Sequence, residues 1–368
     1  MGQFAFIIHP IELEDVFRKL KFMKKWPVPV VEMLIKTLPP FKVSEITGIR
    51  SEYAETTGHF VSCPLTSKQM VTLSEEKVIN KIISAGKVAE KLGAKVVGLG
   101  AMTSVVGDAG ITVAKNLNIA VTTGSSYTVA TALQGTKKAA ELMGIDFSRA
   151  EVLVVGATGS IGSVCARILA REVRLLTLFA RDKHRLDSLA FRILRETGLA
   201  VKVTADVKFA TQRADIIITV TGSAEAVIDV MDLKPGALVC DVARPRDVSK
   251  RCAELRNDVL VIEGGVVDVP GQVDFGFSFG FPPRTSYACM AETMILALEG
   301  KHESFTLGRD LSVAQIDEIS RLADKHGFKL SGFRSFERAI TNAEIEQVRK
   351  TKPLMGMRNT IKNPCRCW

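Results

Sequence analysis

Short apolar runs alternate with amphipathic stretches along most of the chain. Residues 75–92 place apolar side chains on one stripe of a helix, and Gly93 follows where helices commonly end. A second helix is predicted from about 127 to 143. Four apolar runs around these helices have the length of β-strands: residues 4–8, 59–63, 95–100 and 119–122. This order of strand, turn and helix favours a parallel α/β fold.

A second unit of the same kind starts after a linker at 146–149. Its apolar runs are nearly uninterrupted in aliphatic and β-branched residues, at 152–155, 175–180, 201–203, 215–220, 237–241 and 259–262. Such runs are typical of strands that are covered on both faces. The chain beyond Gly332 is basic and less patterned, after helices predicted at about 182–197, 285–299 and 312–326. Nearer the start, residues 11–36 mix apolar and basic residues at helical spacing, with Pro27 and Pro29 as interruptions.

A glycine-rich turn joins the strand at 152–155 to the following helix. One glycine permits the tight turn, the next lets the backbone approach a pyrophosphate, and the third lets helix and strand pack closely. Backbone N–H groups and the positive end of the helix dipole then face the phosphates. We predict a Rossmann-type dinucleotide site formed by Gly156, Thr158, Gly159, Ser160, Ile161 and Gly162. The alternative is an ordinary glycine turn within a βαβ unit.

The residues after the next strand indicate which dinucleotide binds. An NAD site usually has a carboxylate at this strand tip, but here Ala180 occupies the position and Arg181 follows it. A guanidinium there would pair with a 2′-phosphate, so we predict NADPH, with NADH as the alternative if Asp182 points inward. Thr221 and Gly222 follow a later strand, where a loop would pass near the nicotinamide ribose. A plain surface loop is an equally open interpretation.

Composition and charge narrow the picture only slightly. Lys and Arg number 49 against 40 Asp and Glu, which gives a formal net charge of +9 spread along the chain. This excess fits a soluble basic protein or an acidic partner, such as a phosphorylated cofactor, an acidic carrier protein or an anionic membrane surface. No apolar run of membrane-spanning length and no signal peptide is recognisable. The seven cysteines are irregularly spaced, so we expect reduced thiols in a cytoplasm and no metal site. We also expect no nucleic-acid partner.

A set of short motifs runs in order from about residue 3 to 330. It comprises Gly98-Leu99-Gly100 with Thr103-Ser104, Thr122-Thr123-Gly124 with Tyr127-Thr128, the glycine turn at 155–163, Ala180-Arg181, Gly264-Gly265-Val266-Val267, residues 286–294, Glu299-Gly300-Lys301-His302 and Lys325-His326-Gly327-Phe328. The ordered set resembles the long-chain fatty acyl-[acyl-carrier-protein] reductases of cyanobacteria. No single motif carries the resemblance alone.

The resemblance implies a reaction and a nucleophile. Members of this family reduce a fatty acyl thioester to a free aldehyde with NADPH, through a cysteine-bound acyl intermediate. For this chain we expect the acyl donor to be acyl carrier protein or coenzyme A. Cys289 matches the family's nucleophile. The chain departs from the family at Pro27-Val28-Pro29, at 241–245 and after 332, which leaves the acyl donor and chain length open. An aldehyde-consuming enzyme and a peripheral membrane contact are further expectations.

The residues around Cys289 suit a nucleophile without the family. Thr285 or Ser286 can cap the helix that follows Pro282-Pro283-Arg284, which places Cys289 in its first turn. Helix N–H groups there favour a thiolate and could hold the oxyanion of a tetrahedral intermediate. The alternative is a small core cysteine on an apolar helix. Cys63, which follows a strand and precedes Pro64, is a second cysteine that could face the cleft.

The other cysteines and several polar residues complete the candidate site. Cys165 and Cys240 are predicted in the core, and Cys252, Cys365 and Cys367 are predicted as exposed or terminal. Ligands of open α/β sheets bind at the carboxyl ends of the strands, so four hydroxyl residues are expected to face the cleft: Thr103, Ser104, Thr123 and Ser125. His9 and His302 are candidates for proton transfer, or are structural polar residues.

These predictions describe an α/β protein with a Rossmann-type parallel-sheet domain and an α/β substrate domain. Residues 1–148 form the N-terminal substrate or acyl-binding domain, and residues 149–284 the NADPH-binding domain. Residues 285–332 supply C-terminal helices that carry Cys289 back to the cleft, and residues 333–368 form a basic tail. Two other functions stay open. One is a shikimate-dehydrogenase-like oxidoreductase on a small polar substrate, which would need a Lys/Asp pair between the domains; Lys95 and Asp108 lie near the right loops but do not form a convincing pair. The other is a non-enzymatic dinucleotide-binding protein, in which Cys289 is only packed.

Overall fold

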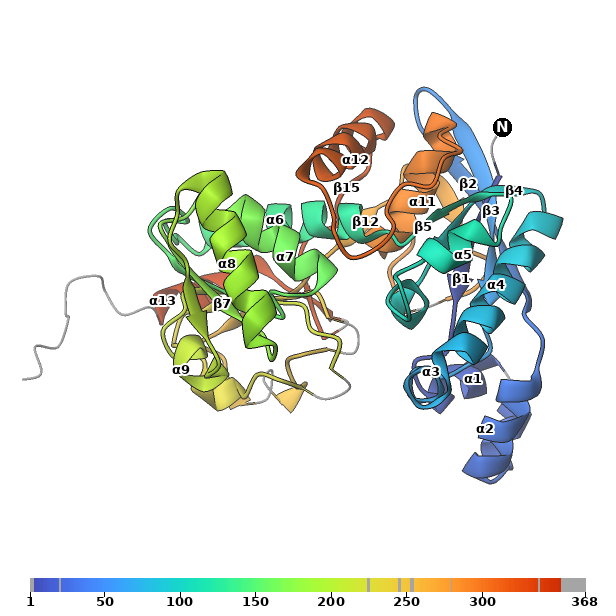
Figure 1. The fold of residues 1–368 in the computed structure, drawn as a ribbon, viewed down its shortest axis with the longest axis horizontal. Helices are drawn as coiled ribbons and strands as arrows, with labels where there is room; N and C mark the ends of the chain where they lie inside the picture. The colour runs from blue at the N-terminus through green and yellow to red at the C-terminus, as the bar shows by residue number, and fades with distance from the viewer. Residues whose placement is uncertain are drawn as a thin grey trace, which may run out of the picture.

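The computed structural model describes most of the chain, namely residues 3–19, 21–223, 226–243, 246–251, 255–278, 280–336 and 338–351. The turn at Arg244-Pro245 and three predicted exposed or terminal cysteines (Cys252, Cys365 and Cys367) lie outside these residues. Figure 1 shows two lobes, each built on its own β-sheet. The predicted α/β class is confirmed.

The first lobe contains a sheet with the strand order β13-β2-β3-β1-β4-β5. Its central strands β1, β3, β4 and β5 run parallel, whereas β2 and β13 pair antiparallel at one side. The strands are β1 (Gln3–Ile8), β2 (Phe41–Arg50), β3 (Glu55–Ser62), β4 (Ala94–Leu99), β5 (Ala120–Thr122) and β13 (Gly271–Asp274). The four strands predicted in this part of the chain are present, and β2 was not predicted.

Helices cover both faces of this sheet because its strand residues alternate between two apolar cores. Ala5 and Ile7 pack under α4 (Glu75–Lys91), whereas Phe4 and Phe6 pack under α11 (Ala288–Glu299). The α4 face also carries α3 (Ser67–Thr72), η2 (Ala101–Ser104) and α5 (Ile111–Lys115). The α11 face is completed by α6 (Ser125–Leu142) and α12 (Val313–His326). Three short helices project from the end of the lobe, α1 (Leu13–Lys19), η1 (Lys21–Lys25) and α2 (Val28–Thr37).

The second lobe has the strand order β11-β10-β9-β6-β7-β8, with every pair parallel. Counted along the chain, this is the 3-2-1-4-5-6 order of dinucleotide-binding sheets. The strands are β6 (Glu151–Val155), β7 (Leu175–Phe179), β8 (Lys202–Thr204), β9 (Ile216–Thr219), β10 (Leu238–Asp241) and β11 (Leu260–Glu263). The connecting helices are α7 (Ser160–Leu169), α8 (Lys183–Thr197), α9 (Val207–Thr211) and η3 (Val230–Asp232).

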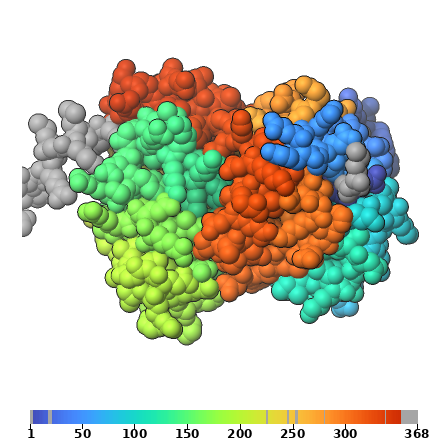
Figure 2. Space-filling view, turned by 90° about the horizontal axis from the view of Figure 1, so that it is seen from above, coloured from blue at the N-terminus to red at the C-terminus, as the bar shows by residue number. Residues whose placement is uncertain are grey.

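The chain returns to the first lobe earlier than the sequence indicates. After Gly264 and Gly265 it forms β12 (Val266–Asp268), which pairs with β14 (Thr285–Tyr287) and β15 (Lys329–Leu330). Between β12 and β14, β13 joins β2 at the edge of the first sheet. Residues 266–284, which the sequence places in the dinucleotide domain, therefore pair with the first lobe. Figure 2 shows the orange segment that follows filling the space between the two lobes.

The segment after Gly332 corrects a second expectation. Its described part is not an appended tail, because it forms β16 (Arg334–Ser335), β17 (Arg338–Ala339) and α13 (Asn342–Lys350). Thr341 and Glu344 form a capping box at the start of α13. Ile345 and Val348 are buried in the core of the second lobe. The sequence did not predict this helix, because only these two apolar residues are buried and the exposed face of α13 carries basic residues.

We expect Ile345→Ala to lower the free energy of unfolding of the second lobe by about 2–4 kcal/mol, because a nearly fully buried side chain would leave a cavity. Urea unfolding followed by circular dichroism measures the change. Gln347→Ala, on the exposed face of the same helix, is the control and should stay within about 0.5 kcal/mol of the parent. Equal effects of the two substitutions would show that α13 is not part of the core.

Candidate active site

The glycine turn after β6 has the geometry of a pyrophosphate cradle. Gly156 has φ +83°, and a Cβ there would lie 2.6 Å from the carbonyl oxygen of Val220. A Cβ at Gly162 would lie 2.3 Å from the carbonyl oxygen of Gly156, so both positions require glycine. The N-cap of α7 is Gly159, which has no side chain to cover the first turn. A dinucleotide phosphate fits this surface, because it meets backbone N–H groups at a helix N-terminus.

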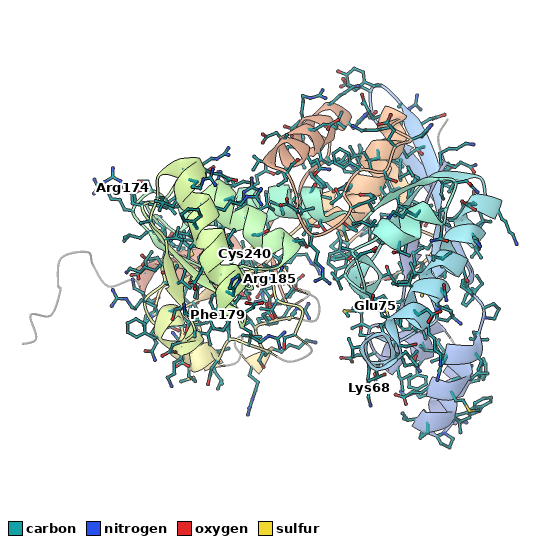
Figure 3. All side chains as sticks on the ribbon, in the orientation of Figure 1. Lys68, Glu75, Arg174, Phe179, Arg185 and Cys240 are labelled. Atoms are coloured by element: carbon teal, nitrogen blue, oxygen red, sulfur yellow. The ribbon has the colours of Figure 1, made fainter. Side chains whose placement is uncertain are left out.

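Positive side chains gather where the adenine end of a dinucleotide would lie. Ala180 follows β7 and is buried, and Arg181 after it is exposed. Asp182 is the N-cap of α8, and its carboxylate accepts the backbone N–H of Arg185 at 3.0 Å. The guanidinium of Arg185 donates to the carbonyl oxygen of Thr158 at 2.8 Å, which places it beside the glycine turn (Figure 3). Arg181 and Arg185 are therefore the candidate guanidinium groups for a 2′-phosphate, and Asp182 is engaged by its own helix.

The loop after β9 is held by a buried carboxylate that the sequence did not single out. Asp247 is fully buried and accepts hydrogen bonds from the Thr219 hydroxyl at 2.5 Å and from the Thr221 N–H at 2.8 Å. The Thr221 hydroxyl also donates to Asp247. Asp247 therefore fixes the backbone of Thr221, and the Thr221 hydroxyl is already hydrogen-bonded within the protein. A Cβ at Gly222 would meet nothing within 4 Å, so packing does not require glycine there.

Cys289 lies in the first turn of α11, as predicted, but a different residue caps that helix. Thr285 and Ser286 belong to β14, and Tyr287 is the N-cap without a side-chain hydrogen bond. The expected caps were wrong because Thr285 directs its hydroxyl to the carbonyl oxygen of Pro282 at 2.8 Å. Cys289 itself is partly exposed. Its thiol therefore combines access to solvent with a place at a helix N-terminus.

A second helix begins against the same cysteine. Gly124, with φ +72°, is the N-cap of α6, and a Cβ there would lie 2.4 Å from the Cα atom of Cys289. On either side of Gly124, the Thr123 hydroxyl donates to the Ser125 hydroxyl at 3.0 Å. Thr123 and Ser125 thus flank the glycine that lies against Cys289. Two helix N-termini thus converge here, although the Tyr127 N–H in the first turn of α6 is already taken by the side chain of Glu292.

A buried carboxylate joins the elements around Cys289. Glu292, one helical turn after Cys289, is fully buried and accepts the backbone N–H of Tyr127 at 2.8 Å. It also accepts the hydroxyls of Thr122 and Thr306, the latter at 2.7 Å. Burial raises the pKa of Glu292, although these hydrogen bonds oppose the shift. The sequence analysis missed this residue, because its partners come from β5, α6 and the segment after α11.

The other described cysteines are poorer nucleophiles. Cys63 is fully buried, and burial raises the pKa of its thiol to about 12. Cys165 and Cys240 are buried in the core of the second lobe, as predicted (Figure 3 labels Cys240), and burial also raises the pKa of Cys165. Among the four cysteines in the described part of the chain, only Cys289 is partly exposed.

Two of the expected cleft residues and both histidines have other positions or partners. His302 lies beyond the C-terminal end of α11, whose last residue Glu299 is about 15 Å along the helix from Cys289, so the structure does not bring His302 to the thiol. The Thr103 and Ser104 hydroxyls donate to carbonyl oxygens of their own turn. The Nε2 atom of His9 accepts the Met102 N–H at 3.1 Å, and burial lowers the pKa of His9.

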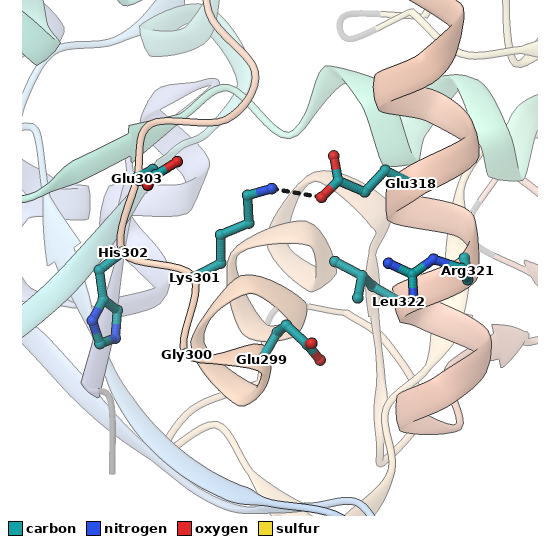
Figure 4. Close-up of a pocket in the computed structure, with 8 residues that line it drawn as sticks. All are labelled: Glu299, Gly300, Lys301, His302, Glu303, Glu318, Arg321 and Leu322. Atoms are coloured by element: carbon teal, nitrogen blue, oxygen red, sulfur yellow. Dashed lines mark hydrogen bonds and ion pairs between the residues drawn. The ribbon is translucent and has the colours of Figure 1, made fainter.

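The pocket beside His302 is polar. It has a volume of about 360 Å³ and lies between the end of α11 and α12. Lys301 and Glu318 form an ion pair of 2.5 Å across it, while His302 points away from that pair (Figure 4). This pocket is therefore separate from the thiol at the opposite end of α11.

Aromatic rings belong to the apolar cluster against which Cys289 packs. Phe4, Phe6 and Phe60 from the sheet and Phe275 after β13 are buried in one cluster, against which Cys289 packs. The Phe60 ring centroid lies 6.2 Å from that of Phe275 and 5.2 Å from that of Phe277. The start of α11, which carries Cys289, therefore adjoins an apolar core.

Comparisons with known proteins agree with the dinucleotide site. Residues 137–263, which contain the second lobe's sheet, match the family model described as Shikimate / quinate 5-dehydrogenase. The chain is 28% identical over 306 residues to the long-chain acyl-[acyl-carrier-protein] reductase of Synechococcus elongatus, covering 79% of this chain and 87% of that protein. It is 31% identical over 322 residues to the aminotransferase PigE of a Serratia strain, covering 86% of this chain but only 37% of PigE.

Other relatives share smaller parts of the chain. The glutamyl-tRNA reductase of Flavobacterium psychrophilum is 32% identical over 114 residues, or 30% of this chain and 26% of that protein. Among solved structures, the L-tryptophan dehydrogenase of Nostoc punctiforme is similar, with a TM-score of 0.42 and 11% identity over 95% of this chain and 87% of that one. The family-model match over residues 137–263 and the strand order of the sheet identify the second lobe as a Rossmann-type NAD(P)-binding domain. No helix in the described part of the chain is long and apolar enough to cross a membrane.

We expect Arg181→Ala to weaken NADPH binding by about tenfold or more and to leave NADH binding nearly unchanged, because only NADPH carries the 2′-phosphate. Titration of each cofactor, followed by its fluorescence, gives the two dissociation constants. Arg174→Ala, which removes an exposed guanidinium at the far end of the same lobe, is the control (Figure 3). An equal loss for NADH and NADPH would contradict the assignment of Arg181 to the phosphate.

We expect Glu292 to leave a signature in the pH dependence of stability. Because the pKa of Glu292 is raised in the folded state, its contribution to the free energy of unfolding is fully present below pH 4.5, the ordinary carboxyl value. That contribution is lost as the pH rises through the folded-state pKa. The glutamine in Glu292→Gln cannot titrate, and its NH₂ group would face the hydrogen-bond donors around it. We therefore expect the free energy of unfolding to fall by about 1–3 kcal/mol relative to the parent, with the largest difference near pH 4.5. Thermal melting between pH 4.5 and 8 measures the difference from the parent.

Glu299 on the same helix provides a control of opposite sign. The ammonium of Lys325, hydrogen-bonded to its carboxylate, holds the pKa of Glu299 below 4.5. Its contribution is therefore present above pH 4.5 and is lost as pH falls. Glu299→Gln should lose most stability at the upper end of the pH series. Parallel melting curves for the two variants would rule out the proposed state of Glu292.

Proposed function

We propose that the chain reduces a fatty acyl thioester of acyl carrier protein or coenzyme A to a free aldehyde with NADPH, through a thioester on Cys289. The observation that carries this proposal is the partly exposed cysteine where the starts of α6 and α11 meet, packed against an apolar core. The similarity to an acyl-[acyl-carrier-protein] reductase over most of both chains supports it. The same similarity does not extend to the choice of donor.

The chemistry of acyl transfer suits this position. The Cys289 sulfur attacks the carbonyl carbon of the acyl thioester and forms a new C–S bond, and the donor's C–S bond breaks so that its thiol leaves. The negative charge that develops on the carbonyl oxygen is stabilised by the partial positive charge at the start of α11, since the first-turn N–H of Tyr127 in α6 already donates to Glu292. Glu292 does not touch the reacting atoms but holds the two helix starts together.

The second lobe would hold the reductant for the next step. The glycine cradle at Gly156 and Gly162 receives the pyrophosphate, and Arg181 and Arg185 face the 2′-phosphate. Bound NADPH would supply the hydride that releases the acyl group as an aldehyde. Asp247 holds the Thr221 loop at the carboxyl end of β9, where ligands of such sheets bind.

The apolar core beside the start of α11 suits a long-chain substrate. Phe60, Phe275 and Phe277 contact one another within or at the edge of the cluster against which Cys289 packs. An alkyl chain that enters along it would exchange water for apolar contacts, at about 0.8 kcal/mol for each methylene buried. A tunnel for the acyl chain in the first lobe remains our prediction.

The two competing functions have weaker support. A shikimate-type reaction would need a Lys/Asp pair, but Lys95 lies at the amino end of β4 and Asp108 follows its carboxyl end, about 13 Å or more along the strand. A protein that only binds dinucleotide would not need a partly exposed thiol between two helix starts. Both alternatives predict that no acyl group is transferred to the protein.

An acyl-trapping experiment tests the proposal. With a palmitoyl thioester and no NADPH, we expect one acyl group per chain by intact mass, mapped to Cys289 and released as aldehyde when NADPH is added. Cys289→Ala should form no adduct and no aldehyde. Cys63→Ala, which removes a buried thiol, is the matched control and should react like the parent. Either no adduct on the parent protein or aldehyde from Cys289→Ala would refute the proposed chemistry.

A further inference from the structure

A small helical tip projects from the end of the first lobe. It consists of α1, η1 and α2, and Figure 1 shows α2 at the extremity of the lobe, beyond α3 and α4. Met23, Val31 and Ile35 form its own buried core, separate from the main cores of the lobe. The tip therefore has a small apolar core of its own beside the main cores of the lobe.

The outer surface of this tip is unusually apolar. Five large side chains are between two-fifths and two-thirds exposed: Phe22 (59%), Trp26 (43%), Val28 (51%), Val30 (42%) and Met33 (66%). The rings of Phe22 and Trp26 contact each other edge to face, with centroids 6.0 Å apart. Single exposed apolar residues are ordinary on protein surfaces, but a group of them within a dozen residues indicates an interaction surface.

Lysines surround these apolar side chains. Lys21, Lys24, Lys25 and Lys36 are all exposed, and none has an ion-pair partner among the described residues. Glu32, on the same helix as Lys36, is half-buried. The group of Phe22, Trp26, Val28, Val30 and Met33 with these four lysines is called the tip patch below. It combines apolar contact with positive charge, whereas the other acidic residues of the tip, Glu14 and Asp15, lie on α1.

The tip is held rigidly on the lobe, so this exposure does not come from a frayed end. The Gln69 side chain on α3 donates to the carbonyl oxygen of Glu32 at 2.8 Å. The Lys81 ammonium on α4 donates to the carbonyl oxygens of Lys36 at 3.1 Å and Leu38 at 2.6 Å. Two helices of the lobe therefore fix α2 from one side and leave the tip patch facing outward.

We propose that the tip patch docks the protein on an anionic phospholipid surface. Aromatic and aliphatic side chains would enter the boundary between headgroups and acyl chains, while the lysines stay at the level of the phosphates. The narrow projecting shape suits insertion into a bilayer surface, whereas a protein partner of ordinary size would cover about 800 Å² of a broader face. This inference does not depend on the chemistry proposed for Cys289.

The binding test uses the full chain and vesicles of defined composition. We expect flotation with vesicles that contain phosphatidylglycerol, weaker binding to pure phosphatidylcholine, and release as salt rises. Lys24→Glu with Lys25→Glu should weaken binding to anionic vesicles about tenfold or more. Phe22→Ser with Met33→Ser should do the same at every salt concentration, because that variant loses the apolar contact rather than the charge.

Matched substitutions in the second lobe separate docking from general surface effects. Phe191 is 61% exposed on α8, so Phe191→Ser removes a comparable aromatic side chain. Arg171→Glu with Arg174→Glu reverses two exposed charges at the other end of the molecule. Both control variants should bind vesicles like the parent. Acyl transfer to Cys289 from a soluble thioester should be unchanged in every variant, which separates this inference from the proposed reaction.

Trp26 reports directly on insertion, because the chain has only one other tryptophan, Trp368. In a Trp368→Phe background, we expect the Trp26 emission to shift to the blue on anionic vesicles and to be quenched by lipids brominated near the headgroup. No flotation, or flotation unaffected by either tip variant, would overturn the proposal. A dimer that the tip variants dissociate, without vesicle binding by the parent, would identify the patch as a contact between two copies and would also overturn it.

Discussion

The close approach of α6 and α11 at Gly124 and Cys289 is the contact on which the candidate site depends. No side chain fits between them, since a Cβ on Gly124 would overlap the cysteine backbone. The buried carboxylate of Glu292 secures this approach by accepting hydrogen bonds from three elements. Burying such a group is costly unless donors surround it, so the packing of the two helices and the hydrogen-bond network require each other.

Helix α6 connects this contact to the dinucleotide lobe. It packs on α11 and α12 at one end and on α7 and β10 at the other. Because α7 begins at the glycine cradle, a single rigid helix relates the position of the thiol to that of the pyrophosphate. The return of the chain at Gly264 and Gly265 adds a second link, in which β13 completes the first sheet. The two lobes are therefore interwoven and not joined by one linker.

Local patterns predicted the regular elements well where the apolar period was uninterrupted. The strands around β1, β4 and β6, the amphipathic helix α4 and the glycine cradle all follow from short stretches of sequence. Prediction failed where the partner is distant. The strand β2 is half exposed and has a mixed pattern, and α13 buries only Ile345 and Val348. The caps of α11 were assigned wrongly, because β14 pairs Thr285 and Ser286 with a strand about twenty residues earlier.

The sequence by itself determined the dinucleotide cradle, the arginine after β7 and the cysteine in the first turn of a helix, because each depends on neighbours within a few residues. Only the tertiary structure decided which hydroxyl residues join that cysteine and that His302 does not. It also revealed Glu292 and Asp247, whose roles come from donors as many as 170 residues away in the chain. Hydrogen bonds and close backbone contacts at that separation leave no periodic trace in a sequence, and they are what makes a thiol on one lobe part of a site.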